Sequence, residues 1–355
     1  MLKESLKKGF PHFYAQVNSE DRITTEHIEK LAKYNIVTLG SQEIDDGKKR
    51  AESEPVRRIK SVNPRTIVLC YLNVFDLEQS SPNLYEIRTK HPDWLLRDRQ
   101  GNPCRAYNQT EKYKSGTRWI MDPRSDWKKF YAQKALEITE AGYDGIFADN
   151  TWGKYNTGDA KVKYSYLELD MTVEEWQNAW AGFLGYVKEQ LGDKLLIDNG
   201  APVKKYLENS DGCMIESFMR LDIKDFEEEM DKARLITKMG KILINHSYYA
   251  NEMITRTNLF RWYYTCSLLT DGYFCYATTF DYWHPEYEIK LGKAKGEYYK
   301  KDSVYQRDFE GGKVMVNPTL KDFRVKLEDE FKLWGKKRVR EVDLPAYSGV
   351  LLQAL

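Results

Sequence analysis

Eight short runs rich in β-branched and aromatic residues alternate with charge-laced segments from residue 12 onward. In the intervening segments apolar residues recur every three to four positions, which is the spacing of an amphipathic helix. This alternation predicts parallel strands joined by helical crossovers. We expect the strands at 12–16, 36–40, 66–73, 145–150, 194–199, 212–218, 241–248 and 272–278.

Between these strands, helical segments are expected at 25–34, 126–141, 173–191, 224–239 and 257–269. The whole pattern fits eight strand–helix units. Candidate caps agree with these limits: Thr24 or Thr25 and Ser125 at N-termini, and Gly142, Gly192 and Gly240 at C-termini. Residues 12–279 are close to the roughly 250 residues of a (β/α)8 TIM barrel, the predicted fold. An open doubly wound sheet is the alternative, but no expected strand is followed by a glycine-rich phosphate turn.

Two segments interrupt the rhythm. Residues 75–124 carry four prolines and show little sustained periodicity, so they predict a long functional loop over the C-terminal mouth of the barrel. Residues 280–355 predict a small antiparallel β-domain packed on a barrel of residues 1–279. Its hairpin is expected at 305–309 and 313–317, and later strands at 339–344 and 350–355.

Charge and composition exclude several classes of protein. The 55 basic and 54 acidic side chains leave a formal charge of +1, which lacks the basic excess of a nucleic-acid binder. No run approaches the roughly 20 apolar residues of a membrane span. Residues 1–10 are basic without a following apolar run, so we expect a cytoplasmic protein if the chain is complete, and a periplasmic or secreted one if a leader was removed. The oligomeric state is left open.

The cysteines and histidines favour neither a disulfide framework nor a metal centre. Five scattered cysteines form no CxxC pair, and the five histidines show no HxH or HExxH spacing. Neither a GxSxG elbow nor a cysteine-nucleophile signature is present. We therefore expect no metal and no cofactor.

Aromatic residues are abundant for such a polar chain, with 25 Tyr, 14 Phe and 9 Trp. Tyr and Trp combine an apolar face with a polar group, which suits a carbohydrate site, and an aromatic core is an equally good explanation. The rings expected on loops are Trp94, Trp119, Trp152, Tyr282 and Trp283. Placed around a barrel mouth, they predict a surface for stacking sugars.

Two carboxylates stand at the C-terminal ends of expected strands, where TIM-barrel active sites are built. Asp149 ends the fourth strand and Glu216 the sixth, with Asn199 at the end of the fifth. Glycoside hydrolysis uses such a pair, one at the anomeric carbon and one at the glycosidic oxygen. Each alone has a structural alternative, an Asx turn or N-cap for Asp149 and a salt-bridged loop residue for Glu216.

Further polar and aromatic residues are expected around the same mouth to contact a sugar. These candidate substrate-binding residues are Tyr14, Gln16, Tyr71, Asn73, Asn150, Trp152, Asn199, His246 and Tyr276. Each one alone is also compatible with a place in the core or rim, and His246 with a satisfied structural histidine.

Four runs resemble the glycoside hydrolases grouped as glycosyl hydrolase-like family 15, and the related barrels around glycoside hydrolase family 114. They are HFY at 12–14, YDGIFADN at 143–150, MIESF at 214–218 and FEGGKVMVNP at 309–318, with an LPA tail beginning at residue 344. The resemblance implies a retaining hydrolase of α-linked sugars, with Asp149 as nucleophile and Glu216 as acid/base. An insertion at about 154–170 departs from the family and bears on substrate and subsite number.

This assignment carries two geometric expectations and leaves two rival functions. The carboxyl groups should lie ~5–5.5 Å apart for retention or ~6.5–9.5 Å for inversion. Burial and the neighbouring Asp149 should raise the pKa of Glu216. The rivals are a non-catalytic carbohydrate-binding barrel and a metal-dependent lyase or isomerase.

Overall fold

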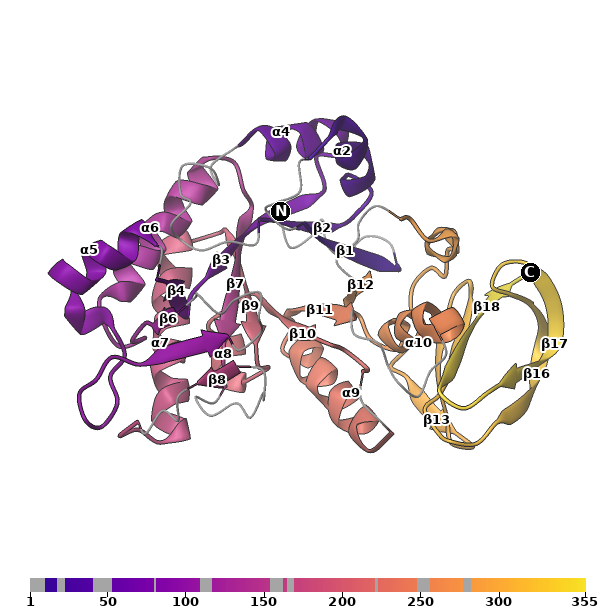
Figure 1. Cartoon of the computed structure of the whole chain (residues 1–355). Coiled ribbons are helices and arrows are strands. Elements are labelled where there is room, and N and C mark those ends of the chain that lie inside the picture. The colour runs from indigo at the N-terminus through magenta and orange to yellow at the C-terminus, as the bar shows by residue number, and fades with distance from the viewer. Residues whose placement is uncertain are drawn as a thin grey trace.

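Eight parallel strands close a barrel at the centre of the molecule (Figure 1). The computed structural model describes residues 10–17, 23–40, 53–79, 81–108, 117–153, 162–164, 169–220, 223–247, 256–276 and 282–355. The barrel strands are β1(His12–Val17), β2(Ile36–Leu39), β3(Ile67–Asn73), β7(Gly145–Thr151), β9(Leu195–Gly200), β10(Gly212–Glu216), β11(Ile242–Ser247) and β12(Tyr273–Tyr276). They pair in chain order, and β12 returns to β1. The predicted TIM barrel is confirmed, with each strand within a few residues of its expected limits.

The five expected helices are present, and three further ones were missed. The expected ones are α2(Thr25–Leu31), α6(Trp127–Glu140), α7(Val173–Leu191), α9(Ile223–Lys238) and α10(Arg256–Leu268). Those missed are α4(Ser53–Val62), α5(Pro82–Lys90) and α8(Lys204–Glu208). α7 has the expected limits because a Thr172–Glu175 capping box starts it and Gly192, at φ 58°, ends it. Thr24 caps α2, whereas Asp126 rather than Ser125 holds the N-cap position of α6.

Alternate residues of each barrel strand point into the barrel and out toward the helices. The interior contains aliphatic side chains and a layer of stacked aromatic rings from Tyr14, Tyr71 and Phe147. Phe147 stands two residues before Asp149, so this layer lies directly beneath the end of β7. The barrel is therefore a packed core whose upper surface forms the floor of the mouth.

The two strands that carry the carboxylates, β7 and β10, both begin with a glycine. A Cβ on Gly145 would lie 2.2 Å from the backbone oxygen of Leu195, and one on Gly212 would lie 2.2 Å from that of Ile242. No side chain fits at such distances, so glycine is required for the neighbouring strand to approach. This explains why the DGIFADN run starts its strand with glycine.

The described residues of the segment 75–124 form a small unit of strands and a helix, where a long loop was expected. It contains β4(Asp76–Glu78), α5, β5(Arg105–Asn108) and β6(Thr117–Ile120). The insertion after Trp152 contributes β8(Val162–Tyr164), and the four strands pair in the order β4-β6-β5-β8. Residues 154–161 and 165–168 of that insertion lie outside the described residues. The segment 75–124 and the insertion after Trp152 thus build one antiparallel sheet together. It lies on the side of the barrel opposite the C-terminus (Figure 1).

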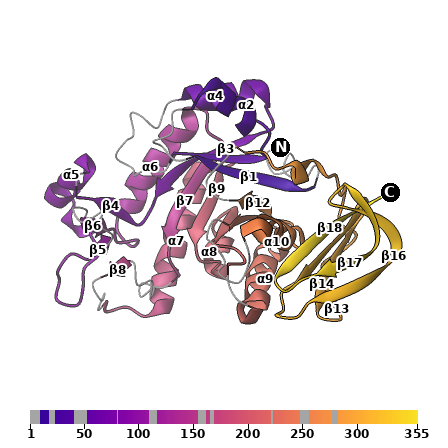
Figure 2. The ribbon, with the colours of Figure 1, turned by 45° about the vertical axis from the view of Figure 1, so that its right-hand side comes forward.

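The C-terminal part of the chain forms a six-stranded antiparallel sheet in the order β13-β14-β15-β18-β16-β17. Its strands are β13(Tyr299–Lys301), β14(Val304–Phe309), β15(Gly312–Asn317), β16(Phe323–Leu333), β17(Lys337–Leu344) and β18(Ser348–Ala354). The expected hairpin is β14–β15, whereas β13 and β16 were missed. The sheet lies against α10, where a Cβ on Gly349 would meet Thr265 at 1.9 Å (Figure 2).

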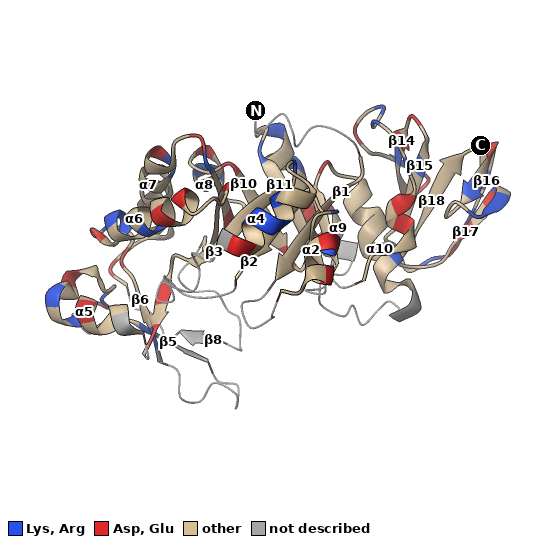
Figure 3. Cartoon of the chain, turned by 90° about the horizontal axis from the view of Figure 1, so that it is seen from above, with Lys and Arg blue, Asp and Glu red and all other residues tan. Residues whose placement is uncertain are grey.

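Surface charge is mixed over the molecule. Figure 3 shows basic and acidic residues next to one another along the outer helices, in a chain of near-zero net charge. Within the described ranges, no helix combines the length and the apolarity needed to cross a membrane. All five cysteines are buried thiols.

Candidate active site

The three polar residues predicted at the ends of the fourth, fifth and sixth strands meet at the mouth of the barrel. Asn199 Nδ2 donates hydrogen bonds to Asp149 Oδ1 at 2.7 Å and to Glu216 Oε2 at 3.2 Å. Strand register explains the meeting, because Asp149 pairs with Asn199 across β7 and β9. The two carboxylate oxygens cannot be farther apart than the sum of the two bonds. The two carboxyl groups therefore lie close together, linked through one amide nitrogen.

Asp149 is the more enclosed of the two carboxylates. It is half-buried, and its Oδ2 accepts a short hydrogen bond from the Tyr71 hydroxyl. Burial and, to a smaller extent, the charge of Glu216 raise the pKa of Asp149 from 3.8 to about 6, against hydrogen bonds from Tyr71, Asn199 and the backbone at Asn150 that lower it. A carboxyl held by donors in this way is oriented, and it ionises near neutral pH.

Glu216 differs from the expectation. Its side chain is exposed, whereas burial was expected, and Asp149 is the more enclosed member of the pair. The reason is position: Glu216 is the last residue of β10 and projects above the strand end, whereas β7 continues to Thr151 beyond Asp149. The pair therefore consists of a carboxylate on the floor and one on the rim.

Backbone strain follows directly after both carboxylates. Asn150 has φ 70° and Ser217 has φ 62°, in the left-handed region that non-glycine residues seldom adopt. At Asn150 the cause is a bulge, because the β7–β9 register shifts between Asp149 and Thr151. Such strain costs about 1–3 kcal/mol per residue and clusters at functional sites.

A buried polar network lies behind the same strands, on the side that faces the helices. Asp198 is fully buried, and Ser210 Oγ donates to its Oδ1 at 2.8 Å while Thr151 Oγ1 lies 3.4 Å from its Oδ2. Thr151 also donates to the carbonyl of Asn199 at 3.1 Å. The network joins β7 and β9 to the start of β10, and so helps to hold Asn199 between the two carboxylates.

Of the other predicted contacts, Gln16, Asn150 and His246 stand at strand ends around the mouth. Gln16 Oε1 accepts a hydrogen bond of 3.2 Å from the Tyr14 hydroxyl. Tyr14 itself is fully buried in the barrel interior, so it supports Gln16 from below and does not reach a substrate. His246 is buried on β11 and pairs in register with Glu216.

Two predicted substrate contacts make other contacts in the structure. Asn73 is the buried last residue of β3, in register with Asp149, and its side-chain amide donates to Asp76 Oδ1 at 2.8 Å and accepts from the Phe75 backbone at 2.9 Å. Tyr276 points outward and packs on Phe260 of α10 at 5.4 Å, because Cys275 takes the inward position of β12. Successive side chains of a strand point to opposite faces, so a shift of one residue moves a side chain from the inside of the barrel to the outside. The sequence alone did not show which alternate residues of β12 point inward.

The aromatic rings predicted to stack on sugars are mostly packing residues. Trp119 is buried on β6, between the guanidinium groups of Arg88 and Arg105. Trp283 packs edge-on against Phe13, an outward-facing residue of β1, and Trp94 stacks on His91 at 4.1 Å. These rings sat among prolines and polar residues, a pattern that does not distinguish an exposed ring from the core of a small ordered unit. Only Tyr282, of the five, is largely exposed among the described residues, at 59%.

Trp152 follows β7 and is half-buried. Its carbonyl accepts hydrogen bonds from Trp176 Nε1 at 2.8 Å and from the Tyr206 hydroxyl at 3.1 Å. These bonds fix the chain as it leaves the mouth and anchor it to α7 and α8.

Sequence reasoning missed the ion pair that supports Tyr71. Arg118 of β6 contacts Asp76 Oδ1 through two nitrogens, at 2.7 and 2.9 Å, and Glu78 at 3.0 Å. The same Arg118 acts electrostatically on the Tyr71 hydroxyl. A signal was available in the alternating pattern of residues 117–121, but the expected loop obscured it.

No set of three or more potential metal-ligating side chains gathers in the part of the chain that the structure describes.

Comparison with known proteins agrees with the barrel fold. The model of a family described as hypothetical glycosyl hydrolase family 15 matches residues 60–313. Curated proteins gave no match. Of the three solved structures that follow, the second and third have TM-scores above 0.5 and share the fold. The glycoside hydrolase domain of PelA from Pseudomonas aeruginosa is 16% identical, covers 77% of this chain and 97% of that one, and has a TM-score of 0.49. The α-glucosyl transfer enzyme XgtA is 10% identical, with 97% and 99% covered and a TM-score of 0.61. An α-amylase from Anoxybacillus is 10% identical, with 100% and 98% covered and a TM-score of 0.57.

Proposed function

Because the chain belongs to the hypothetical glycosyl hydrolase family 15, whose model matches residues 60–313, we propose that it is a retaining glycoside hydrolase of α-linked oligo- or polysaccharides. Asp149 is the nucleophile and Glu216 the acid/base. The observation that carries the proposal is Asn199, whose single amide nitrogen contacts both carboxylates. It supports the short spacing of a retaining pair.

In the first step Asp149 attacks the anomeric carbon as the glycosidic C–O bond breaks. Glu216 gives its proton to the departing oxygen, and the sugar remains as an ester on Asp149. The positions support this division of roles. A nucleophile must be fixed beneath the ring, and Asp149 is held by Tyr71 and Asn199.

In the second step water attacks the anomeric carbon of the ester. Glu216 takes the proton of that water, and the bond to Asp149 breaks with its electron pair returning to the carboxylate. Exposure of Glu216 supports this role, because the same group must meet both the leaving oxygen and the incoming water.

Hydrolysis of paired substrates tests the assignment. Asp149→Asn should lose turnover of every glycoside that the wild type cleaves, because an amide cannot form the glycosyl ester. Glu216→Gln should lose at least about a hundredfold on natural glycosides, yet retain much more activity on glycosyl fluorides, whose leaving group needs no proton.

The α and β anomers of each aryl glycoside, run side by side, test the linkage. Cleavage of β anomers alone would contradict the α direction, and full activity of Asp149→Asn would contradict the mechanism. Binding without turnover by the wild type, across the whole panel, would favour the carbohydrate-binding barrel instead.

A further inference from the structure

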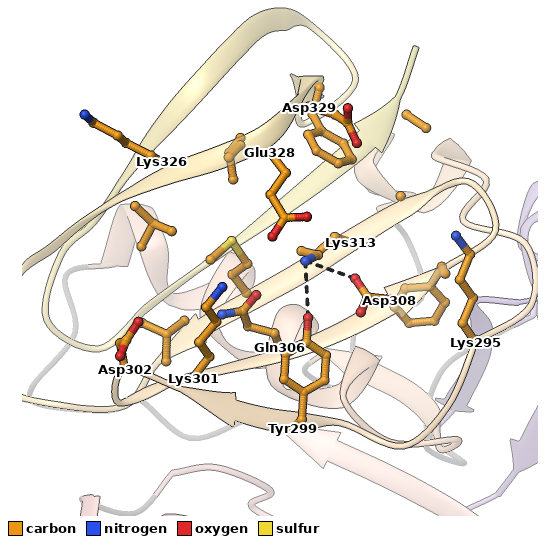
Figure 4. Close-up of a pocket in the computed structure, with 18 of the residues that line it drawn as sticks. Lys295, Tyr299, Lys301, Asp302, Gln306, Asp308, Lys313, Lys326, Glu328 and Asp329 are labelled. Carbon is orange, nitrogen blue, oxygen red and sulfur yellow. Dashed lines mark hydrogen bonds and ion pairs between the residues drawn. The ribbon is translucent and has the colours of Figure 1, made fainter.

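A cleft of about 740 Å³ lies on the C-terminal sheet, away from the barrel mouth (Figure 4). Alternation along β14 determines which side it opens on. Tyr305 and Phe309 pack toward the barrel and α9, whereas Val304 and Gln306 face the other way and line the cleft. The first half of β16 forms the opposite wall. The cleft is therefore separated from the candidate active site by the thickness of the sheet.

The cleft combines an apolar floor with a fixed polar cluster. Val304 and Met315 are buried at its floor. Lys313 Nζ lies 3.2 Å from the Tyr299 hydroxyl and 3.1 Å from Asp308 Oδ1, as the dashed lines in Figure 4 mark. The Tyr299 ring is 38% exposed, so part of its face remains available to a ligand.

Gln306 points to a ligand. Its side chain is only 5% exposed and lines the cleft beside Lys313 and Lys301 (Figure 4). Among the residues that the structure describes, no protein group forms a hydrogen bond with its amide. The amide therefore offers its two donors and one acceptor to whatever enters the cleft.

The charges that line the cleft balance. They are Lys295, Lys301, Lys313, Arg324 and Lys326 against Asp302, Asp308, Glu310, Glu328 and Asp329. Neither a polyanion nor a polycation is favoured by such a lining, because each sign meets its opposite. Alternating donors and acceptors, an amide and a tyrosine face suit a neutral, hydroxyl-rich ligand with an apolar ring face.

We propose that this cleft is a second carbohydrate site, which binds a neutral oligosaccharide segment without cleaving it. The inference rests on the proposed function in one respect, since the ligand class is that of the proposed substrate. The cleft contains acidic groups. Asp308, the carboxylate of the polar cluster, is paired with Lys313, and we expect the cleft to bind and not to cleave. A polysaccharide held there would keep the enzyme on its substrate between cleavage events.

Calorimetric titration of the full chain with maltohexaose, cellohexaose, laminarihexaose and mannohexaose tests the proposal. Asp149→Asn is the background, so that no ligand is consumed. At least one hexasaccharide should bind, and Gln306→Met and Tyr299→Ala should each weaken that binding by about tenfold, the effect of one lost hydrogen bond or ring contact.

Two matched controls make the result specific. Gln353→Met is the same substitution on β18, on the face toward Gly335 and Ile289, and Tyr85→Ala removes a ring that is 77% exposed on α5. Both should bind within twofold of the background chain, and thermal melts should show all four variants folded.

Binding that the cleft substitutions leave unchanged would place it at the barrel mouth and overturn the proposal. Absence of binding to all four hexasaccharides would overturn it as well. Hydrolysis of the same hexasaccharides by the wild type is scored separately. Maltohexaose, the α-linked member of the set, would count against the proposed function alone if it bound through Gln306 but was never cleaved.

Discussion

The Tyr71 hydroxyl controls the charge of Asp149 at the scale of single residues. Asp149 must be ionised to attack, and its pKa is raised to about 6, so kcat/KM should rise with pH through an acidic limb near that value. Tyr71→Phe removes a hydrogen bond that lowers the pKa, and should move the limb up by about one pH unit. Measured pH profiles check this; an unmoved limb would mean that another group controls it.

Asp198 provides a separate pH effect, on stability. Burial raises its pKa from 3.8 to about 6. The folded protein therefore holds a proton that the unfolded chain releases between these values, and stability falls as pH rises from about 4 to 6. The contribution of Asp198 to that fall is roughly 3 kcal/mol.

Urea denaturation between pH 4 and 7 measures this effect. Asp198→Asn cannot ionise, so the variant should show a clearly shallower fall than the wild type, with Asp149 supplying the remainder. Parallel curves for the two proteins would contradict the prediction.

How far single residues could be predicted depended on strand parity. Asp149, Asn199 and Glu216 were found because strand ends are recognisable from the polar residue that terminates an apolar run. The outward turn of Tyr276 and the local hydrogen bonds of Asn73 could not be found, because a run of apolar residues does not state which of its faces is inside. The exposure of Glu216 depends on where its strand ends to within one residue.

Close contact between strands gives the clearest prediction at the scale of elements. Gly145→Ala places a methyl group against the backbone of β9 and should lower the free energy of unfolding by about 1–3 kcal/mol. Gly182→Ala is the matched control, since a Cβ there meets nothing within 4 Å in the middle of α7. It should stabilise by about 0.5–1 kcal/mol. Equal effects of the two substitutions would refute the packing argument.

Strands and helices of the barrel were predictable because each is amphipathic within a short window. The β4-β6-β5-β8 sheet was not, since its strands are three or four residues long, and β8 comes from a different segment of the chain than the other three. Pairing between residues near 107 and 163 is long-range, and no local pattern encodes it. The helix α8 was missed because its five residues are too few to show a helical spacing of apolar residues.

The attachment of the C-terminal sheet is decided at the scale of the whole molecule by Arg307. It is 4% exposed, and it donates to the Thr270 carbonyl and to Asp271, both at 2.6 Å, at the end of α10. Arg307→Met leaves the Thr270 carbonyl without this donor and removes the ion pair with the exposed Asp271 carboxylate, and should cost about 1–3 kcal/mol.

Arg324→Met is the matched control, because Arg324 pairs with Asp343 on the exposed surface of the same sheet. It should change stability by less than about 0.5 kcal/mol. Chemical denaturation compares the two, and a small effect at Arg307 would mean that apolar packing alone attaches the sheet. The division into a barrel of residues 1–279 and a β-domain of residues 280–355 stays a prediction.

The central claim is that the sugar passes through an ester on Asp149, and mass spectrometry tests it most directly. In Glu216→Gln the first step with a glycosyl fluoride needs no acid, whereas the second lacks its base, so the ester should accumulate. Peptide mapping after incubation with fluorides that the wild type hydrolyses should find one added glycosyl group on the peptide that contains Asp149. An adduct on another residue, or none while fluoride is still released, would contradict the account.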